Sequence, residues 1–373
     1  MKKFKRVLFY VPYPIGPMDS APKVRAYNLY KELNLICDVV LISGSLTGFL
    51  SAIYPNRTKL SKFKISNRLF DGIKCYLDGE FVNSIDYVYI EGLASPLFIH
   101  DYNVFNLFKK KKIPIFTFIR DLYWKYPDTL KKTIIRRFWY NRCENELQWY
   151  LKNASGMLFP SPDMAETLNF ENKFLLPPGG DPSQCIDRQL PMNKNITYIG
   201  GISNKMGIDI LSNAMNIVVK EYPDAHCTII GRGDNEIVHK YCRKPFITYV
   251  SNVSYFDVPK VLSNTDITAI PIPNIPHNRF ALPVKLFDYM SSNRPIVATN
   301  CPSMTHLIEK EKIGLITKDN PKSFAEGIIF LLDNPDLAQK YGDNAYKSVI
   351  ARNSWRARAN RLLNIMENYS KSC

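Results

Sequence analysis

Lys285 and Asp288 lie three residues apart in the segment PVKLFDYM, which precedes the strand-like run IVAT. Pro283 suits the first position of a helix, because the N–H that proline lacks would be unsatisfied there. Residues three apart share one helix face, so the two charged groups project to the same side. A lysine in the first turn opposes the helix dipole, and an anion in front of that turn would offset this cost. The spacing predicts either an anion-binding helix or an exposed ion pair, the latter worth about 0.2–0.5 kcal/mol.

Two glycine-rich turns follow strand-like runs in the same half of the chain. Gly200 and Gly201 lie in YIGGISNKMG, where a backbone without side chains could approach a diphosphate closely. Gly231 and Gly233 lie in CTIIGRGD and open a second turn of this kind. Neither segment completes the pattern GxGxxG, which argues against a dinucleotide-dependent dehydrogenase. A purely structural glycine turn is the alternative interpretation.

In the first half of the chain, Arg120 and Asp121 directly follow the apolar run IFTFI. If that run is a parallel strand, the pair lies at its carboxyl end, where open α/β sheets bind ligands. A carboxylate there could deprotonate or orient an acceptor hydroxyl group. The alternative is structural, with Asp121 as a helix N-cap and Arg120 as its ion partner.

Short apolar runs alternate with longer amphipathic stretches along most of the 373 residues, which predicts parallel sheets with helices on both faces. The alternation occurs in two blocks, and the length exceeds one typical core, so we expect an α/β protein with two doubly wound domains. A stretch rich in proline and glycine at 177–195 is the expected linker. The expected strands are RVLFYV, DVVLIS, YVYIEG, IFTFIR, GMLFPS, ITYIGG, CTIIGRG, ITYVSN, ITAIPIP, PIVATN and GLIT.

The formal net charge of +15 predicts attraction to an anionic partner. Basic residues gather at 109–112 and at 131–137, and the second group continues into Phe138, Trp139 and Tyr140. A basic and aromatic helix favours an anionic membrane surface, and a solvated basic face is the alternative. No helix-turn-helix, zinc-finger or RNA-recognition pattern accompanies the charge, so we expect no nucleic acid as a partner.

The eight cysteines are scattered singly, which fits a reducing compartment better than a disulfide framework. No Asp-x-Asp and no histidine cluster follows a strand-like run, so we expect no metal and no other cofactor. The N-terminal apolar run is short and broken by prolines, which indicates a first strand rather than a signal peptide. No run approaches the roughly 20 apolar residues that span a bilayer. We expect a cytoplasmic protein that associates at most peripherally with the inner face of the membrane.

The stretch Pro283–Asn300 resembles the nucleotide-sugar-binding segment of retaining GT-B glycosyltransferases of the family 4 type. Its usual form is Pro-x-Lys-Leu-x-Glu-Tyr-Met-Ala-x-Gly-x-Pro-Val-Val-Ala, and here Asp288 replaces the Glu and Asn293 the Gly. The resemblance covers most of the chain and implies two Rossmann-like domains that face a cleft, with a C-terminal helix that crosses back to the N-terminal domain. The implied acceptor-binding domain is 1–180 with the helix at about 354–373, and the implied donor-binding domain is 192–353.

The resemblance implies that the second domain binds a nucleotide-diphosphate sugar. Lys285 would be the main cation on the diphosphate and a catalytic residue, and Asp288 would accept hydrogen bonds from ribose hydroxyls. The backbone at Val253 would contact the base. Further implied donor-binding positions are Gly200, Gly201, Lys205, Gly231 and Arg232.

The chain departs from the family pattern at three further places. The family usually has Arg at the position of Gly201 and Lys at the position of Met206. Its first Glu, eight residues before Asp288, falls on Phe280. These departures leave Lys285 as the best cation for the diphosphate.

The segment with Arg120 and Asp121 resembles the Arg-Asp-Leu-Trp-Pro motif of family members that act on lipid-linked acceptors. It also resembles the corresponding place in the membrane-associated glucuronosyltransferase of xanthan assembly, where an Asp serves as the base. Asp121 is therefore the implied catalytic base. The residues implied on the acceptor side are Asp19, Arg25, Glu91 and Arg120.

Together these features predict a metal-independent, retaining glycosyltransferase with a nucleotide-sugar donor and a saccharide or lipid-linked acceptor, acting in polysaccharide, glycolipid or glycan assembly. Two alternatives stay open. A non-hydrolysing nucleotide-sugar epimerase shares the fold, but five scattered histidines argue against its acid- and histidine-rich site. A sugar-nucleotide-binding protein without catalysis would explain the three departures from the family pattern.

Overall fold

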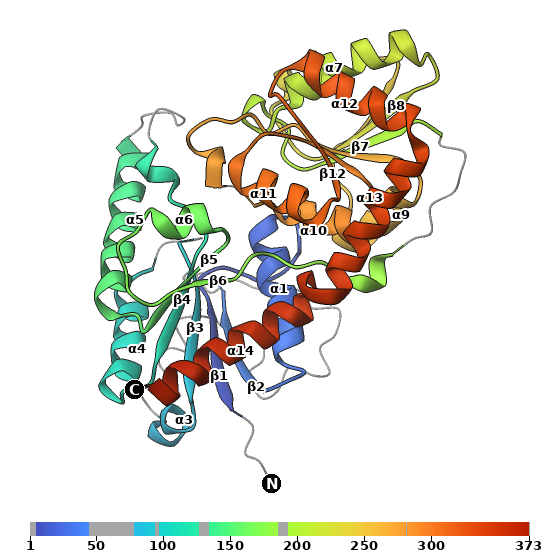
Figure 1. The fold of residues 1–373 in the computed structure, drawn as a ribbon. Helices are drawn as coiled ribbons and strands as arrows, with labels where there is room; N and C mark the ends of the chain where they lie inside the picture. Colours follow the sequence, from blue (N-terminus) through green and yellow to red (C-terminus); the bar gives the residue numbers. More distant parts are fainter. Residues whose placement is uncertain are drawn as a thin grey trace. The chain divides into compact units, whose positions relative to one another are not determined.

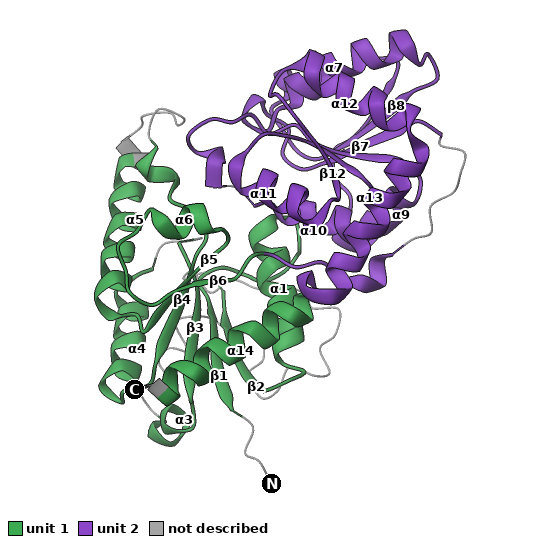
Figure 2. Cartoon of the chain, in the orientation of Figure 1, with its two compact units in different colours: residues 1–177, 355–373 green, residues 178–354 purple. Residues whose placement is uncertain are grey.

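The structure is a computed structural model that describes residues 5–44, 78–93, 97–126, 134–185, 193–280 and 282–372, with the backbone alone for 134–136 and 372. The chain forms two compact units (Figure 2). Unit 1 comprises residues 1–177 and 355–373, and unit 2 comprises residues 178–354. Each is built on a six-stranded sheet with helices on both faces (Figure 1). These two doubly wound sheets confirm the predicted fold class.

The sheet of unit 1 has the strand order β2-β1-β3-β4-β5-β6, and its strands pair in parallel. The strand order switches direction between β1 and β3, so a ligand is expected beyond the carboxyl ends of these two strands. Only the three-residue strand β6 is absent from the strands that the sequence predicts for this unit. The elements are β1 (Arg6–Val11), α1 (Ala21–Leu33), β2 (Asp38–Ser43), α3 (Gly79–Asn83), β3 (Tyr87–Gly92), α4 (Ile99–Lys110), β4 (Ile115–Ile119), η1 (Tyr123–Lys125), α5 (Ile134–Asn153), β5 (Gly156–Phe159), α6 (Pro162–Glu166), β6 (Lys173–Leu175) and α14 (Trp355–Ser372).

The C-terminal helix α14 completes unit 1. Arg356 of α14 forms an ion pair with Glu32 of α1 at 2.5 Å. Further along the helix, Tyr369 packs edge-on against Phe116 of β4, with ring centroids 5.5 Å apart. The helix therefore lies against both the first helix and the sheet of this unit, which confirms its predicted return to the N-terminal domain.

The sheet of unit 2 has the order β12-β11-β10-β7-β8-β9, also with parallel pairs. Its order switches direction between β7 and β10, and the first glycine-rich turn follows β7 directly. The elements are η3 (Pro182–Gln184), β7 (Asn195–Ile199), η4 (Asn204–Met206), α7 (Ile208–Glu221), β8 (His226–Ile230), α8 (Asn235–Cys242), β9 (Ile247–Val250), η5 (Tyr255–Asp257), α9 (Val258–Ser263), β10 (Ile267–Ile270), η6 (Asn278–Phe280), α10 (Val284–Ser291), β11 (Ile296–Thr299), α11 (Pro302–Glu311), β12 (Gly314–Thr317), α12 (Pro321–Asp333), α13 (Pro335–Ser348) and η7 (Val349–Asn353).

Two turns of unit 2 need a residue that accepts a positive φ. Gly207 begins α7 with φ +75°, and a Cβ there would lie 1.7 Å from the carbonyl oxygen of Pro271. Asn293 follows α10 with φ 60°. Asparagine tolerates this left-handed conformation better than most residues, so it can replace the glycine that is usual at this place without loss of the turn.

Candidate active site

The two glycine turns of unit 2 touch each other through their backbones. Gly200 has φ +151° and Gly231 has φ +150°. A Cβ on Gly231 would lie 1.7 Å from the carbonyl oxygen of Gly200, so only glycine fits at this contact. The approach brings the carboxyl ends of β7 and β8 together and leaves backbone exposed at Gly201. This is the geometry that lets main-chain amides approach a phosphate.

Lys285 lies behind the first of these turns. A Cβ on Gly200 would be 2.8 Å from the Lys285 Nζ atom, and the same nitrogen lies 4.0 Å from the centroid of the Tyr198 ring. Nζ is closed off from solvent and has no hydrogen-bond acceptor among the described residues. Burial lowers the pKa of this amine to about 7. A diphosphate at the glycine turn would supply the missing acceptor.

Tyr289 joins helix α10 to β7, and Tyr198 fixes the glycine turn that follows β7. The backbone N–H of Ile199 donates to the hydroxyl oxygen of Tyr289 over 2.8 Å, and the hydroxyl of Tyr198 donates to the carbonyl oxygen of Gly201 over 2.7 Å. The helix begins at Val284, so Pro283 is its N-cap residue and not, as predicted, its first helical residue. The extended backbone of Pro283 explains this one-residue difference.

Asp288, one turn further along α10, is also buried without full satisfaction. Its Oδ1 atom has no hydrogen-bond partner in the described part of the chain. Burial, and then the charge of Asp181, raise the pKa of this carboxyl to about 7. The segment that carries Asp181 is fixed to the same helix, because its backbone N–H donates to Ser291 Oγ over 3.0 Å. A ligand hydroxyl would find an acceptor here.

The remaining predicted donor-binding residues lie on loops around this helix. Lys205 and Arg232 have exposed side chains, and Val253 is half-buried between β9 and η5. The backbone of Arg232 accepts from the Ile202 N–H over 2.8 Å, which ties the two glycine turns together. The exposed cations can move toward a ligand, whereas Lys285 is the one that the fold already holds at the turn.

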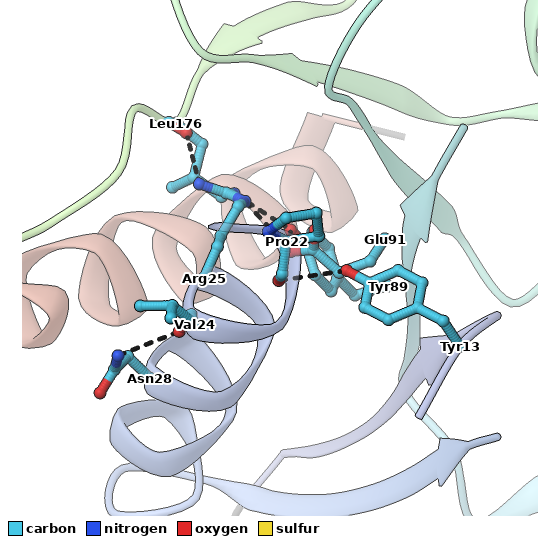
Figure 3. Close-up of polar contacts among 8 residues, drawn as sticks. All are labelled: Tyr13, Pro22, Val24, Arg25, Asn28, Tyr89, Glu91 and Leu176. Carbon is cyan, nitrogen blue, oxygen red and sulfur yellow. Dashed lines mark hydrogen bonds and ion pairs between the residues drawn. The ribbon is translucent and has the colours of Figure 1, made fainter. Parts of the chain in front are cut away.

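Two of the residues predicted for the acceptor side, Arg25 and Glu91, form a buried ion pair at the carboxyl ends of the strands of unit 1 (Figure 3). Arg25 Nε lies 3.3 Å from Glu91 Oε1, and the Tyr89 hydroxyl donates to the same oxygen over 2.7 Å. Arg25 also donates from Nη1 to the carbonyl oxygen of Leu176 over 3.2 Å. Arg25 and Glu91 are 2% and 1% exposed, so their polar groups contact the surrounding protein and not solvent.

Arg120 and Asp121 follow β4 directly, as predicted from the sequence. The guanidinium carbon of Arg120 lies 6.0 Å from the centroid of the Tyr13 ring, and its Nη1 is buried without a hydrogen-bond partner among the described residues. Asp121 is half-buried, and the N-cap residue of the following η1 is Leu122. Asp19 lies in the loop before α1 and pairs with Lys23 at 2.9 Å.

A match to a family model covers most of unit 2. Residues 193–334 match the model described as glycosyl transferases group 1. Among curated proteins, the chain is 26% identical over 190 residues to spore coat protein SA of Bacillus subtilis, which covers 47% of this chain and 48% of that protein. It is 22% identical over 185 residues to the phosphatidyl-myo-inositol mannosyltransferase of Mycobacterium leprae, which covers 48% of each. The chain thus spans about half the length of these curated relatives.

Solved structures match over nearly the whole chain. Sucrose-phosphate synthase from Thermosynechococcus elongatus has a TM-score of 0.68 at 15% identity, over 99% of this chain and 100% of that one. HepE of Anabaena, solved with UDP-glucose, has a TM-score of 0.65 at 12% identity, over 98% of both chains. The chain therefore has the GT-B fold. At these identities the likeness establishes the fold alone and leaves the chemistry to the residues described above.

Three buried residues that support the predicted site segments or the loops of unit 1 were not among the predicted site residues. Tyr198 and Tyr289 fix the glycine turn, but in the sequence they belong to ordinary apolar runs. Glu146 of α5 is fully buried and accepts hydrogen bonds from the backbone N–H groups of Leu93 and Leu97 at 2.9 and 3.2 Å. Burial raises the pKa of Glu146 to about 7, although these hydrogen bonds oppose the shift. The signal in the sequence that could have predicted the role of Glu146 is a glutamate at a core position of a helix.

Proposed function

We propose that this protein is a glycosyltransferase that moves a sugar from a nucleotide-diphosphate donor, held by unit 2, to a saccharide or lipid-linked acceptor, held by unit 1. The observation that carries the proposal is the unpartnered Lys285 nitrogen behind the Gly200 turn, with Asp288 one helical turn away. A buried cation without an acceptor is costly, and a diphosphate at the turn would remove that cost. The match of residues 193–334 to group 1 glycosyl transferases supports the same assignment.

The donor end of the reaction needs charge stabilisation as the bond to the sugar breaks. Negative charge develops on the departing diphosphate, where glycine-turn amides and the Lys285 ammonium would stabilise it electrostatically. Asp288 would accept hydrogen bonds from the ribose hydroxyls, and the backbone at Val253 would contact the base. Family 4 enzymes retain the anomeric configuration, and we extend this outcome to the present protein. No step of this scheme uses a metal ion.

At the acceptor end, Asp121 would deprotonate or orient the attacking hydroxyl group. Its position directly after β4 supports this role. Arg120 lies beside it with an unpartnered, buried Nη1 atom, which suits contact with a polar acceptor. Arg25 and Glu91, which are buried, would support the acceptor side by holding its loops in place.

A surface of unit 1 would bring the enzyme to an anionic membrane on the inner, cytoplasmic face. Arg142 lies over the rings of Phe98 at 4.3 Å and Phe138 at 5.8 Å, so the beginnings of α4 and α5 form one surface. Large apolar side chains are exposed there, with Ile99 at 79% and Phe138 at 63%. The basic residues 131 and 132 lie outside the described residues, and 136 is described by its backbone alone, but Arg137 on the same helix is exposed. None of the described helices is long and apolar enough to cross a bilayer.

A thermal-shift screen with UDP, GDP, ADP and their sugars tests the proposal, because a ligand that binds only the folded state raises the midpoint of unfolding. We expect one nucleotide series to raise it, and a protein that responds to none would contradict the donor assignment. Turnover of the selected donor with membrane extract then separates an enzyme from a binding protein without catalysis. Epimerised donor in the absence of extract, detected by NMR, would favour the epimerase.

A further inference from the structure

The Lys285 amine is not exposed at the surface, where a diphosphate could bind it directly. Its nitrogen is closed off from solvent, and none of the described residues accepts a hydrogen bond from it. An ammonium group has three donors, and donors buried without partners cost free energy. The amine is therefore stored in a position that a ligand cannot reach until the side chain moves.

Tyr198 provides the contact that defines this position. The amine nitrogen lies over the Tyr198 ring, 4.0 Å from its centroid, so the ring packs against the amine in its uncharged as well as its charged form. The ring itself is held by the hydrogen bond from its hydroxyl to the Gly201 carbonyl oxygen. The backbone of Gly200 also limits the space, since a Cβ there would lie 2.8 Å from the nitrogen and 3.2 Å from the Tyr198 hydroxyl oxygen. The amine thus lies beside both the ring and the turn that is expected to hold the phosphates.

We propose that Tyr198 is a positioning residue for the diphosphate site: its ring holds the Lys285 amine behind the glycine turn, and an arriving diphosphate draws the amine out. This inference rests on the proposed function, since it assumes that unit 2 binds a nucleoside diphosphate. The flexible four-carbon stem of lysine allows the amine to move while α10 stays in place. The exchange replaces a ring contact by charge-assisted hydrogen bonds to phosphate oxygens, which are stronger.

A proton accompanies this movement. Burial lowers the pKa of the stored amine to about 7, so the uncharged amine predominates at pH 8. An amine that binds a diphosphate is an ammonium, so binding must draw a proton from the solvent. Asp288 lies on the same helix, and Asp181 before η3 acts on Asp288. Helix α10 also packs against α13 and η7, whose charged residues are Asp336, Lys340, Asp343, Lys347 and Arg352. Asp288, with a pKa of about 7, is mostly ionised at pH 8 and adds little to proton exchange there.

The first test needs no ligand. Lysines labelled with ¹³C at Cε are titrated by NMR, and the Lys285 signal is assigned with Lys285→Arg. We expect a midpoint near pH 7 in the wild type and in Tyr198→Phe, which keeps the ring. In Tyr198→Leu the amine has lost the ring and turns to solvent, so its midpoint should move to near 10.5. A wild-type midpoint near 10.5, or an unchanged midpoint in Tyr198→Leu, would overturn the proposal. Tyr198→Met serves the same purpose if the leucine variant does not fold.

The second test measures proton uptake when UDP binds at pH 8, by calorimetry in two buffers with different heats of ionisation. We expect close to one proton per UDP for the wild type and for Tyr198→Phe, and none for Tyr198→Leu. If Tyr198 only supports the fold, its replacement would weaken UDP binding equally at every pH and leave proton uptake unchanged, and this result would contradict the proposal. If UDP, GDP and ADP all fail to bind, the proposed function falls, while the ligand-free titration still decides the position of the amine.

Discussion

Each unit buries a pair of charged side chains, and the two pairs differ in what surrounds them. In unit 1, Arg25 and Glu91 neutralise each other and share hydrogen bonds with Tyr89 and the Leu176 carbonyl. In unit 2, Lys285 Nζ and Asp288 Oδ1 are buried on one helix without a hydrogen-bond partner among the described residues. Removing one partner of a buried ion pair is strongly destabilising, whereas a buried charge without any partner is costly as it stands. The Arg25–Glu91 pair therefore supports the fold of unit 1, and we interpret Lys285 and Asp288 of unit 2 as kept for a ligand.

The largest effect should come from breaking the satisfied pair. Arg25→Met leaves Glu91 buried without its partner, so we expect the free energy of unfolding to fall by about 3–5 kcal/mol. The double variant Arg25→Met/Glu91→Leu should recover most of this loss, because an apolar pair carries no stranded charge. Chemical denaturation measures both. A single variant as stable as the wild type would remove the distinction between the units.

Removing the charge of Asp288, which lacks a hydrogen-bond partner at Oδ1, should raise the free energy of unfolding rather than lower it. In the folded state the pKa of Asp288 is about 7, raised from an ordinary value of 3.8, so folding opposes its ionisation. This cost is absent below about pH 4, grows as the pH rises toward 7 and is complete above it. Asp288→Asn should therefore stabilise the protein by roughly 2–4 kcal/mol at pH 8 and hardly at pH 4. Unfolding measured at both pH values checks this, and a destabilised variant at pH 8 would show that Asp288 is satisfied after all.

The comparison of the two units extends to catalysis, because we propose that one acid of unit 1, Asp121, acts on the acceptor. Asp121→Asn should leave donor binding intact and slow sugar transfer by roughly 100-fold or more, the scale of a lost general base. The rate is measured with the donor that the nucleotide screen selects and with membrane extract as the source of acceptor. Asp224→Asn, at an exposed acid of unit 2, is the matched control. Unchanged transfer together with lower stability would make Asp121 a structural residue.

The smallest effect concerns the exposed surface of unit 1. Arg137→Gln removes one positive charge beside Phe138, and each basic residue near an anionic bilayer contributes about 1 kcal/mol. We expect about fivefold weaker binding to anionic vesicles at low salt, and no change for Lys220→Gln on unit 2. Sedimentation with anionic and neutral vesicles at two salt concentrations measures this. Equal binding to both lipids, or to neither, would favour a soluble acceptor.

The sequence predicted the fold well because its signals are local. Every strand predicted from an apolar run is present, and only β6, with three residues, was missed because it is too short to show a pattern. Lys285 and Asp288 could also be predicted from the sequence, since a charged pair at helical spacing stands out beside apolar neighbours. The burial of Arg25 and Glu91 could not be predicted, because the sequence does not show that a charged residue pairs with another one 66 positions away. The role of Tyr198 was hidden for the same reason, since the contact with Lys285 exists only after the sheet is assembled.

The central claim is that unit 2 binds a nucleoside diphosphate through Lys285, and calorimetric titration of the wild type and Lys285→Ala with UDP tests it most directly. A charge-assisted hydrogen bond to phosphate is worth roughly 1.5–3 kcal/mol, so we predict that affinity falls by about 10- to 150-fold. Lys240→Ala, at an exposed lysine of α8, should bind UDP as the wild type does. Wild-type affinity in Lys285→Ala, or an equal loss in Lys240→Ala, would contradict the account.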